Sequence, residues 1–157
     1  MRRLARELGR RLRHRGYTLA TAESCTGGWV AQVVTSIAGS SAWFERGFVT
    51  YSNAAKQEML GVKAATLARF GAVSAEAAIE MAKGALMHSQ SQISVAITGV
   101  AGPQGGSEDK PVGTVWFAWA GGGRPPITLC EHFEGRRVAV RRQAVETALR
   151  GLIERLQ

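Results

Sequence analysis

The sequence predicts one α/β domain in which helices cover both faces of a central sheet. Runs rich in β-branched and aromatic residues alternate with segments of helical periodicity, which is the pattern of α/β folds. The chain has 157 residues, of which 45% are hydrophobic, enough for one core, and neither a long linker nor an internal repeat divides it. We therefore expect a single three-layer α/β/α domain over residues 1–157.

The first expected element is an amphipathic helix over residues 1–15. Leu4, Leu8 and Leu12 recur every four residues, arginines occupy the other faces, and Gly16 ends the helix. The basic side of this helix is expected to be solvated, because runs of charge usually lie on a surface.

Two strands and four helices are expected between residues 17 and 89. The strands are β-favouring runs, and serine, asparagine or glycine marks the helix boundaries. Ser74 caps the last of these helices, whose apolar positions recur at helical spacing and predict a core-facing stripe. In order, the elements are a strand over 17–22, a helix over 26–39, a strand over 44–52, helices over 54–60 and 64–70, and a helix over 75–89.

Three strands and one helix complete the expected fold. The run 93–99 is short, apolar and β-branched, as in a buried strand, and it opens into a loop of Gly, Pro, Ser and charged residues over 99–113. The remaining elements are strands over 114–120 and 127–133, joined by the Gly- and Pro-rich segment 121–126, and a helix from about 137 to 156.

The formal charge of +8 is concentrated near the two ends of the sequence. Residues 1–15 hold seven arginines and one glutamate, residues 136–157 hold six arginines and two glutamates, and residues 16–135 carry a charge of −2. The middle of the chain is therefore not an extended basic surface, and aromatic and basic residues are not interleaved there. We expect no nucleic-acid partner on these grounds.

Segments that would cross a membrane or direct secretion are not evident. No apolar run approaches roughly 18 residues, and the arginine-rich N-terminal segment precedes no apolar run of secretory type. Cys25 and Cys130 lie far apart and in no metal-ligand spacing. We expect a cytoplasmic protein with reduced thiols, no membrane contact and no metal.

Ser24 lies at the junction between the first strand and the following helix. A hydroxyl there would project beyond the carboxyl end of a strand, where open α/β sheets bind ligands. The N–H groups of Cys25, Thr26 and Gly27 could face the same point and stabilise an oxyanion. The alternative is that Ser24 only caps the helix, although capping does not require Gly27 and Gly28, which weaken a first helical turn.

A nucleophilic serine needs a base, and the sequence offers several candidates. His14, His88 and His132 are not excluded, but none lies in a motif that would orient it. Lys56 follows a strand end and Tyr51, and a lysine can replace histidine when burial lowers its pKa. An isolated lysine on a short helix is more often a solvated surface residue.

A second glycine-rich stretch begins at Thr98 and contains Gly99, Gly102 and Gly106. It follows a strand, so its backbone could approach a ligand and its N–H groups could hold a phosphate. It matches neither the Walker loop nor the dinucleotide fingerprint, and a flexible surface loop is the alternative.

Several segments together resemble the C-terminal domain of the CinA family, in particular its stand-alone PncC-type nicotinamide-nucleotide amidohydrolases. The similarity runs from about Leu8 to Leu156. The segments are TAESCTGG, GSSAWFERGFVTYSNAAK, GAVS, ITGVAGPQGGSEDKPVGTVW and the arginine-rich final segment. The resemblance implies hydrolysis of the carboxamide of nicotinamide mononucleotide to nicotinate mononucleotide and ammonia, a step of pyridine-nucleotide salvage, without a metal or cofactor.

The resemblance also implies roles for three residues. Ser24 matches the family's serine, Lys56 its lysine and Tyr51 its assisting tyrosine. We expect neutral Lys56 to accept the proton of Ser24 during attack, with Tyr51 orienting the pair or relaying a proton to the leaving ammonia.

Other residues are expected around this centre. Glu23 could contact substrate or pair with Lys56, and Cys25 is a rival nucleophile whose simpler role is that of a small buried side chain. For the phosphate and ribose we nominate Thr98, Gly99, Gly102 and Gly106, together with Arg137 or Arg141, which lie four residues apart and could share one helix face.

Two further expectations concern partners. The basic terminal segments, and the family's association with competence and DNA damage, leave a non-catalytic nucleic-acid or regulatory binding module as the alternative function. An apolar surface containing tryptophan could support a homodimer.

Overall fold

In a computed structural model that describes residues 1–157, five strands form one mixed sheet in the order β2-β1-β3-β4-β5. β1 is parallel to both β2 and β3, whereas β3–β4 and β4–β5 are antiparallel. The strands are β1 (Leu19–Glu23), β2 (Phe44–Val49), β3 (Ile93–Gly99), β4 (Thr114–Gly121) and β5 (Arg124–His132). The helices are α1 (Arg2–Arg15), α2 (Trp29–Thr35), α3 (Asn53–Leu60), α4 (Ala64–Phe70), α5 (Ala75–Met87) and α6 (Arg137–Arg155), with a 3₁₀ turn, η1, at Ser40–Ala42.

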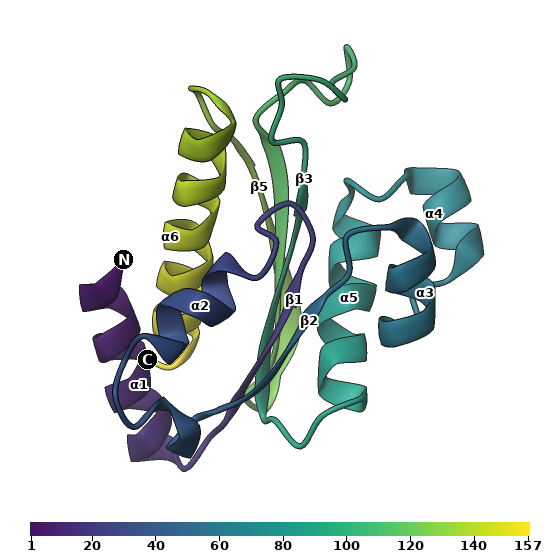
Figure 1. The fold of residues 1–157 in the computed structure, drawn as a ribbon. Coiled ribbons are helices and arrows are strands. Elements are labelled where there is room, and N and C mark those ends of the chain that lie inside the picture. The colour runs from purple at the N-terminus through teal and green to yellow at the C-terminus, as the bar shows by residue number, and fades with distance from the viewer.

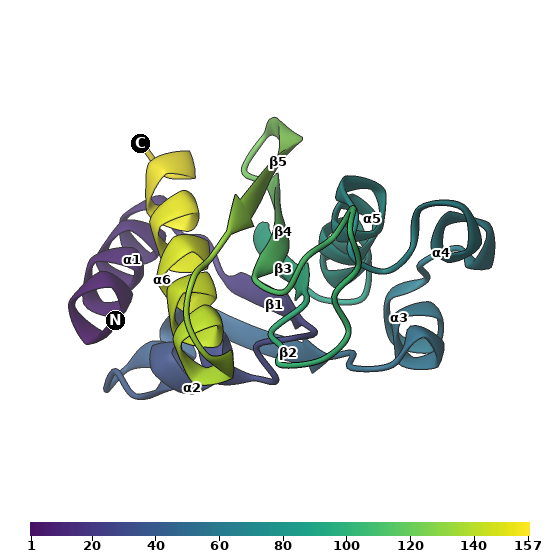
Figure 2. The ribbon, with the colours of Figure 1, turned by 90° about the horizontal axis from the view of Figure 1, so that it is seen from above.

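The helices cover both faces of the sheet, so the expected three-layer α/β/α fold is confirmed. Figure 1 shows α1, α2 and α6 on one side of the sheet and α3, α4 and α5 on the other. The view from above shows the β3–β4 loop, residues 100–113, lying between the first turn of α6 and the α3 side of the molecule (Figure 2). The site described below lies at this edge.

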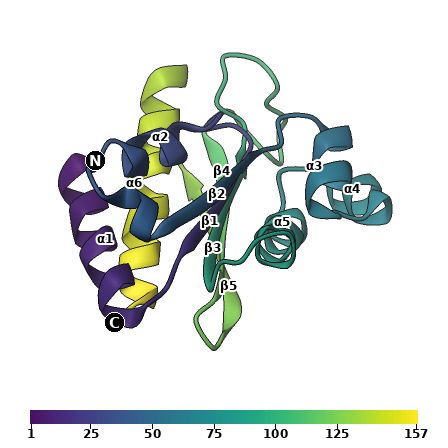
Figure 3. The same cartoon turned by 60° about the horizontal axis from the view of Figure 1, so that its bottom comes forward.

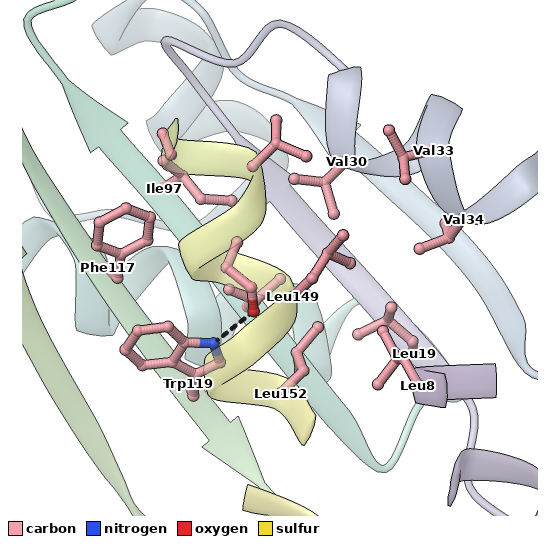
Figure 4. Packing of buried hydrophobic residues seen from close by; sticks show 14 of the residues in the cluster. Leu8, Leu19, Val30, Val33, Val34, Ile97, Phe117, Trp119, Leu149 and Leu152 are labelled. Carbon is pink, nitrogen blue, oxygen red and sulfur yellow. Dashed lines mark hydrogen bonds between the residues drawn. The ribbon is translucent and has the colours of Figure 1, made fainter. Parts of the chain in front are cut away.

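The two faces of the sheet differ in side-chain size. Large residues of β3 and β4, such as Ile97, Phe117 and Trp119, point toward α6, and the Trp119 Nε1–H donates to the Ala148 carbonyl at 3.1 Å (Figure 4). The opposite face, under α5, is lined mainly by alanines: Ala20, Ala22, Ala96, Ala118 and Ala120. Small side chains on that face let α5 lie close to the strands.

Several element boundaries differ from the prediction by two to four residues, including the start of β1 at Leu19 and the end of β2 at Val49, and the differences at α2 and β5 have local causes. The helix expected over 26–39 covers only Trp29–Thr35. It begins late because Gly27 and Gly28 have positive φ, and at its end Thr35 and Ser36 direct their hydroxyls to main-chain carbonyls. β5 begins at Arg124, inside the segment expected to be a connection. Gly121, Gly122 and Gly123 all have positive φ and make the turn tight, and the prolines that follow are tolerated on an edge strand.

Neither a bilayer-crossing helix nor an exposed tryptophan is found. None of the helices combines the length and the apolar character that a membrane span requires. Trp43 and Trp119 are buried, and Trp29 and Trp116 are half-buried. Trp29 and Trp116 are thus the tryptophans that reach the surface, and the homodimer stays a prediction.

Candidate active site

Ser24 directly follows β1, the strand between β2 and β3, and its main chain is fixed by the neighbouring strand. Its N–H donates to the Ile97 carbonyl of β3 at 2.9 Å. The side chain lines a cavity of about 310 Å³ at the carboxyl ends of the parallel strands and is 8% exposed. The position predicted for a reactive hydroxyl, just beyond a strand end in an α/β sheet, is the one that Ser24 occupies.

Lys56 reaches Ser24 from α3. The helix is capped by the Ser52 hydroxyl, which accepts from the Ala55 N–H, and this places Lys56 in the first turn facing inward. Nζ of Lys56 lies 3.0 Å from Oγ of Ser24 and donates to the Thr50 carbonyl at 2.9 Å. Lys56 is only 2% exposed, so the solvated surface role that applies to most lysines does not apply here.

The surroundings of Lys56 favour its neutral form. Burial lowers the pKa of the ammonium, and no carboxylate forms an ion pair with it. The charge of a Cys25 thiolate would oppose this effect, but burial raises the pKa of the Cys25 thiol to about 12, so the thiol is neutral at physiological pH. A neutral amine within hydrogen-bond distance of a hydroxyl can act as its general base.

Cys25 and Glu23, expected as possible participants, take other positions. Cys25 is 6% exposed and its thiol stays protonated. The role of a small buried side chain therefore suits Cys25 better than the role of a second nucleophile. The Glu23 carboxylate accepts the N–H groups of Val30 and Ala31 at 2.8 and 3.0 Å, beneath the start of α2. Glu23 therefore anchors α2, and it neither lines the cavity nor pairs with Lys56.

Two of the three N–H groups expected to bind an oxyanion have no other acceptor. The N–H groups of Cys25 and Thr26 donate to no other group of the protein, whereas the Gly27 N–H donates to the Ser24 carbonyl at 3.0 Å. Gly27 and Gly28 both have positive φ, so the chain turns sharply after Ser24 and α2 begins only at Trp29. Glycine is therefore required at these two positions by the turn and not by helix capping.

The glycine-rich loop borders the cavity, although not through every glycine expected. Thr98, Gly99 and Gly102 line it, and Gly105 takes the place of Gly106. A Cβ on Gly106 would meet the Val112 nitrogen at 2.8 Å, so this glycine allows the loop to pack on itself. The loop N–H groups of Ala101, Gly102, Gln104 and Gly105 donate to no other group of the protein.

Arg137, at the start of α6, closes one side of the cavity. Its guanidinium donates to the Gly102 carbonyl and to the Tyr51 hydroxyl, both at 2.8 Å. Tyr51 is 60% exposed at the cavity mouth and makes no hydrogen bond to Ser24 or Lys56. The carbonyl that orients Lys56 belongs to the preceding residue, Thr50, so the expectation that Tyr51 orients the pair is not met.

Arg141 lies outside the cavity. Its Nε and Nη2 donate to the carbonyls of Cys25 and Thr26, each at 3.0 Å, and its guanidinium lies over the Trp29 ring. Arg137 and Arg141 thus leave α6 four residues apart but end in different places. Of the two arginines nominated for phosphate, only Arg137 lines the cavity.

Sequence reasoning missed several groups of the cavity wall. The Thr50 carbonyl could not be found from sequence, because a main-chain acceptor has no residue signature. The side chains or main chain of Asn53, Ala72, Val73 and Gln104 also line the cavity. Ala72 and Val73 belong to the GAVS segment, which is part of the family resemblance but is not predicted to lie at the site.

No three His, Cys, Asp or Glu side chains gather where they could hold a metal ion. The polar groups facing the cavity are instead a hydroxyl, an amine, a guanidinium and unpaired N–H groups. This set suits a small anionic substrate and attack by Ser24 on a polarised carbonyl.

Comparison with known proteins gives a consistent result. The model of the CinA C-terminal domain matches residues 1–156. The chain is 60% identical to "Nicotinamide-nucleotide amidohydrolase PncC" of Escherichia coli K12 over 95% of this chain and 90% of that protein, and 51% identical to the protein of the same name from Pseudomonas putida over 96% and 94%. The crystal structure of the competence/damage inducible protein CihA from Agrobacterium tumefaciens superposes with a TM-score of 0.96 at 46% identity, covering 99% of this chain and 95% of that one.

Proposed function

The chain belongs to the CinA C-terminal domain family, and on that premise we propose that it hydrolyses the carboxamide of nicotinamide mononucleotide to nicotinate mononucleotide and ammonia. Its relatives at 51–60% identity carry the name of a nicotinamide-nucleotide amidohydrolase. The observation that carries the proposal is the buried 3.0 Å contact between Ser24 Oγ and Lys56 Nζ at the cavity wall.

The first half of the proposed reaction forms an acyl-enzyme. Ser24 Oγ attacks the carboxamide carbon while its proton passes to neutral Lys56 Nζ. The tetrahedral oxyanion is stabilised by the N–H groups of Cys25 and Thr26, which have no acceptor in the protein. Collapse breaks the C–N bond, and the nitrogen leaves as ammonia with the proton that Lys56 had accepted.

The second half releases the acid. Water attacks the ester carbon and gives a proton to Lys56, and the collapse of this second oxyanion returns the proton to Ser24 Oγ. The carboxylate product leaves and the enzyme is regenerated. The Thr50 carbonyl holds Nζ in place through both halves by accepting one of its hydrogens at 2.9 Å.

The remainder of the substrate is assigned to the glycine-rich loop and Arg137. The free N–H groups at Ala101, Gly102, Gln104 and Gly105 can donate to phosphate oxygens, and the Arg137 guanidinium supplies positive charge beside them. Tyr51, whose hydroxyl accepts from Arg137, is assigned the relay of that same proton from Lys56 to the leaving nitrogen. We place the reaction in the cytoplasm, because both cysteines are free thiols.

Ammonia release from the mononucleotide tests this function. We expect turnover by the wild type, and a loss in kcat of at least about 10³-fold in both Ser24→Ala and Lys56→Ala, as for the loss of a nucleophile or its base. Lys63→Ala, at an exposed lysine outside the cavity, is the matched control and should retain full activity.

The outcomes separate the claims. Near-normal rates in Ser24→Ala or Lys56→Ala would remove that residue from its role. A wild type that releases ammonia only from the dinucleotide or from free nicotinamide would change the substrate, and one that releases none from any of the three amides would refute the proposed function.

A further inference from the structure

Arg141 holds the main chain that follows Ser24. Its Nε donates to the Cys25 carbonyl and its Nη2 to the Thr26 carbonyl, both at 3.0 Å. The guanidinium carbon lies 5.3 Å from the centre of the Trp29 ring, so the group is also held from its flat face. Because two edges of the guanidinium are occupied by main-chain carbonyls, Arg141 is not free to bind a phosphate.

The first of these hydrogen bonds fixes the direction of one oxyanion-binding donor, the Thr26 N–H, and the second acts on the turn beside it. In a trans peptide the C=O and the following N–H lie in one plane and point in opposite directions. Holding the Cys25 carbonyl therefore sets the direction of the Thr26 N–H, which has no acceptor in the protein. Holding the Thr26 carbonyl sets the next plane, whose Gly27 N–H closes the turn on the Ser24 carbonyl.

The turn after Ser24 needs a stabilising contact because its glycines allow several main-chain conformations. Gly27 and Gly28 both have positive φ, and glycine can leave this region at little cost. Glu23 holds the far end of the turn through Val30 and Ala31, and the Trp29 N–H donates to the Thr26 carbonyl at 3.1 Å, but nothing from that side holds the Cys25 carbonyl. Arg141 supplies that contact from α6, more than a hundred residues away in sequence.

We propose that Arg141 is a positioning residue of the catalytic centre. It holds the peptide plane whose free Thr26 N–H stabilises the oxyanion, and it holds the next plane, whose Gly27 N–H donates to the Ser24 carbonyl and so fixes the plane of the free Cys25 N–H. The inference rests on the proposed function, in that it assigns those N–H groups to acyl transfer at Ser24. A positioning role predicts that Arg141 affects kcat, whereas a phosphate-binding role predicts that it affects KM.

Steady-state kinetics of ammonia release distinguish the two roles. A misoriented oxyanion donor weakens only the transition state, so Arg141→Met should lower kcat by roughly 10²-fold and change KM by less than about threefold. A phosphate ligand would instead raise KM and leave kcat near its wild-type value. That second pattern, or an unchanged kcat, would overturn the proposal.

The matched control is Arg142→Met. Arg142 is the next residue of α6 and its side chain is 54% exposed, with an ion pair to Glu146 at 3.5 Å and no contact with the Ser24 turn. This variant should keep both kinetic constants.

Arg141→Lys keeps the positive charge, and it distinguishes loss of positioning from loss of folding. A single ammonium cannot reproduce the planar two-donor geometry, so kcat should remain at least about tenfold below the wild type while the melting temperature stays close to it. Wild-type kcat in this variant would show that charge alone suffices and would contradict the positioning role.

Labelling of Ser24 by a fluorophosphonate separates this inference from the proposed function. The Ser24 Oγ–P bond forms, the P–F bond breaks, fluoride leaves and the hydroxyl proton passes to Lys56, while the phosphonyl oxygen takes the oxyanion position. We expect labelling of Arg141→Met to be slowed by roughly the same factor as kcat.

The combined outcomes are distinct. A wild type that is labelled at Ser24 but releases no ammonia would refute the proposed function, and the labelling rate of Arg141→Met would still decide the role of Arg141. Equal labelling of the two proteins would refute the positioning role. A wild type that releases ammonia but is not labelled at Ser24 would leave the hydrolysis standing and would remove both Ser24 as the nucleophile and the positioning role of Arg141.

Discussion

At the scale of single residues, the environment of Lys56 determines what Ser24 can do. The amine is almost fully buried, its neighbours are a hydroxyl and a carbonyl, and burial lowers its pKa. An amine in these surroundings can lose its proton nearer to neutral pH than lysine ordinarily does. We expect kcat/KM to rise with pH through this lowered pKa and to level off below the usual lysine range.

Lys56→Met tests how much the burial of the Lys56 amine lowers the free energy of unfolding. With a lowered pKa in the folded state, the unfolded chain binds more protons between that value and about 10.4, so the stability of the wild type rises with pH across this window. At neutral pH, Lys56→Met should be more stable by about 0.5–2 kcal/mol in urea unfolding, inactive, and without the rise of stability at alkaline pH.

Lys63→Met, at an exposed lysine, should leave both stability and its pH dependence unchanged. A Lys56→Met variant less stable than the wild type at neutral pH would mean that the contacts with Thr50 and Ser24 outweigh the burial of the amine.

Residue roles were predictable to different degrees. The local sequence around Ser24 indicated a reactive hydroxyl, but Lys56 on its own is expected at a surface, and only the family resemblance singled it out. Its burial comes from α3 packing at the cavity, which is a tertiary effect. Arg137 and Arg141 share a helix spacing, yet their partners, the carbonyls of Gly102 and Cys25, depend on two loops whose positions the spacing does not encode.

At the scale of elements, the contact between α5 and α3 positions Lys56. Gly84 of α5 faces the last turn of α3, and a Cβ there would overlap the Leu60 carbonyl. A glycine inside a helix normally weakens it, but at this position it allows close approach of the two helices.

We expect Gly84→Ala to be destabilising. Overpacking costs about 1–3 kcal/mol and exceeds the gain in helix propensity of about 1 kcal/mol. The melting temperature should fall, and kcat should fall with it, because α3 carries Lys56. Lys83→Ala, at the exposed neighbouring position, should change neither. A higher melting temperature in Gly84→Ala would show that α3 moves aside without cost.

Element types were predicted better than element ends. Periodicity and caps identified each strand and helix, because hydrophobic spacing follows from which face is buried. The end of α2 and the start of β5 differed, since hydroxyl-to-carbonyl hydrogen bonds at Thr35 and Ser36, and a turn of three positive-φ glycines, decide them locally.

At the scale of the whole molecule, part of the basic charge serves to hold the fold together. α1 and α6 pack side by side, which brings the two arginine-rich segments together (Figure 3). Five of their arginines donate to main-chain carbonyls elsewhere in the fold: Arg11, Arg15, Arg137, Arg141 and Arg155. These five arginines thus have a structural role, and the absence of a nucleic-acid partner stays a prediction.

Arg155 is the most buried of them, at 7% exposure, and burial lowers the pKa of its guanidinium. It donates to the carbonyls of Gly121, Arg124 and Pro125 at 2.8–3.1 Å, tying α6 to the β4–β5 turn. Arg155→Met would leave these carbonyls unpaired and should cost about 2 kcal/mol or more in urea unfolding. The exposed Arg150→Met is the control, and equal stability of the two variants would contradict this role.

The pairing of β1 with β3 sets the order in which the molecule can refold. The β4–β5 hairpin pairs residues as close as Gly121 and Arg124, whereas Thr18 and Gln92, which bond beside the β1–β3 pairing, are 74 positions apart. Non-local contacts form late, because a long loop must close first. Ser24 is held by the Ile97 carbonyl of β3, so recovery of catalysis after denaturation has to wait for the longest-range pairing of the sheet.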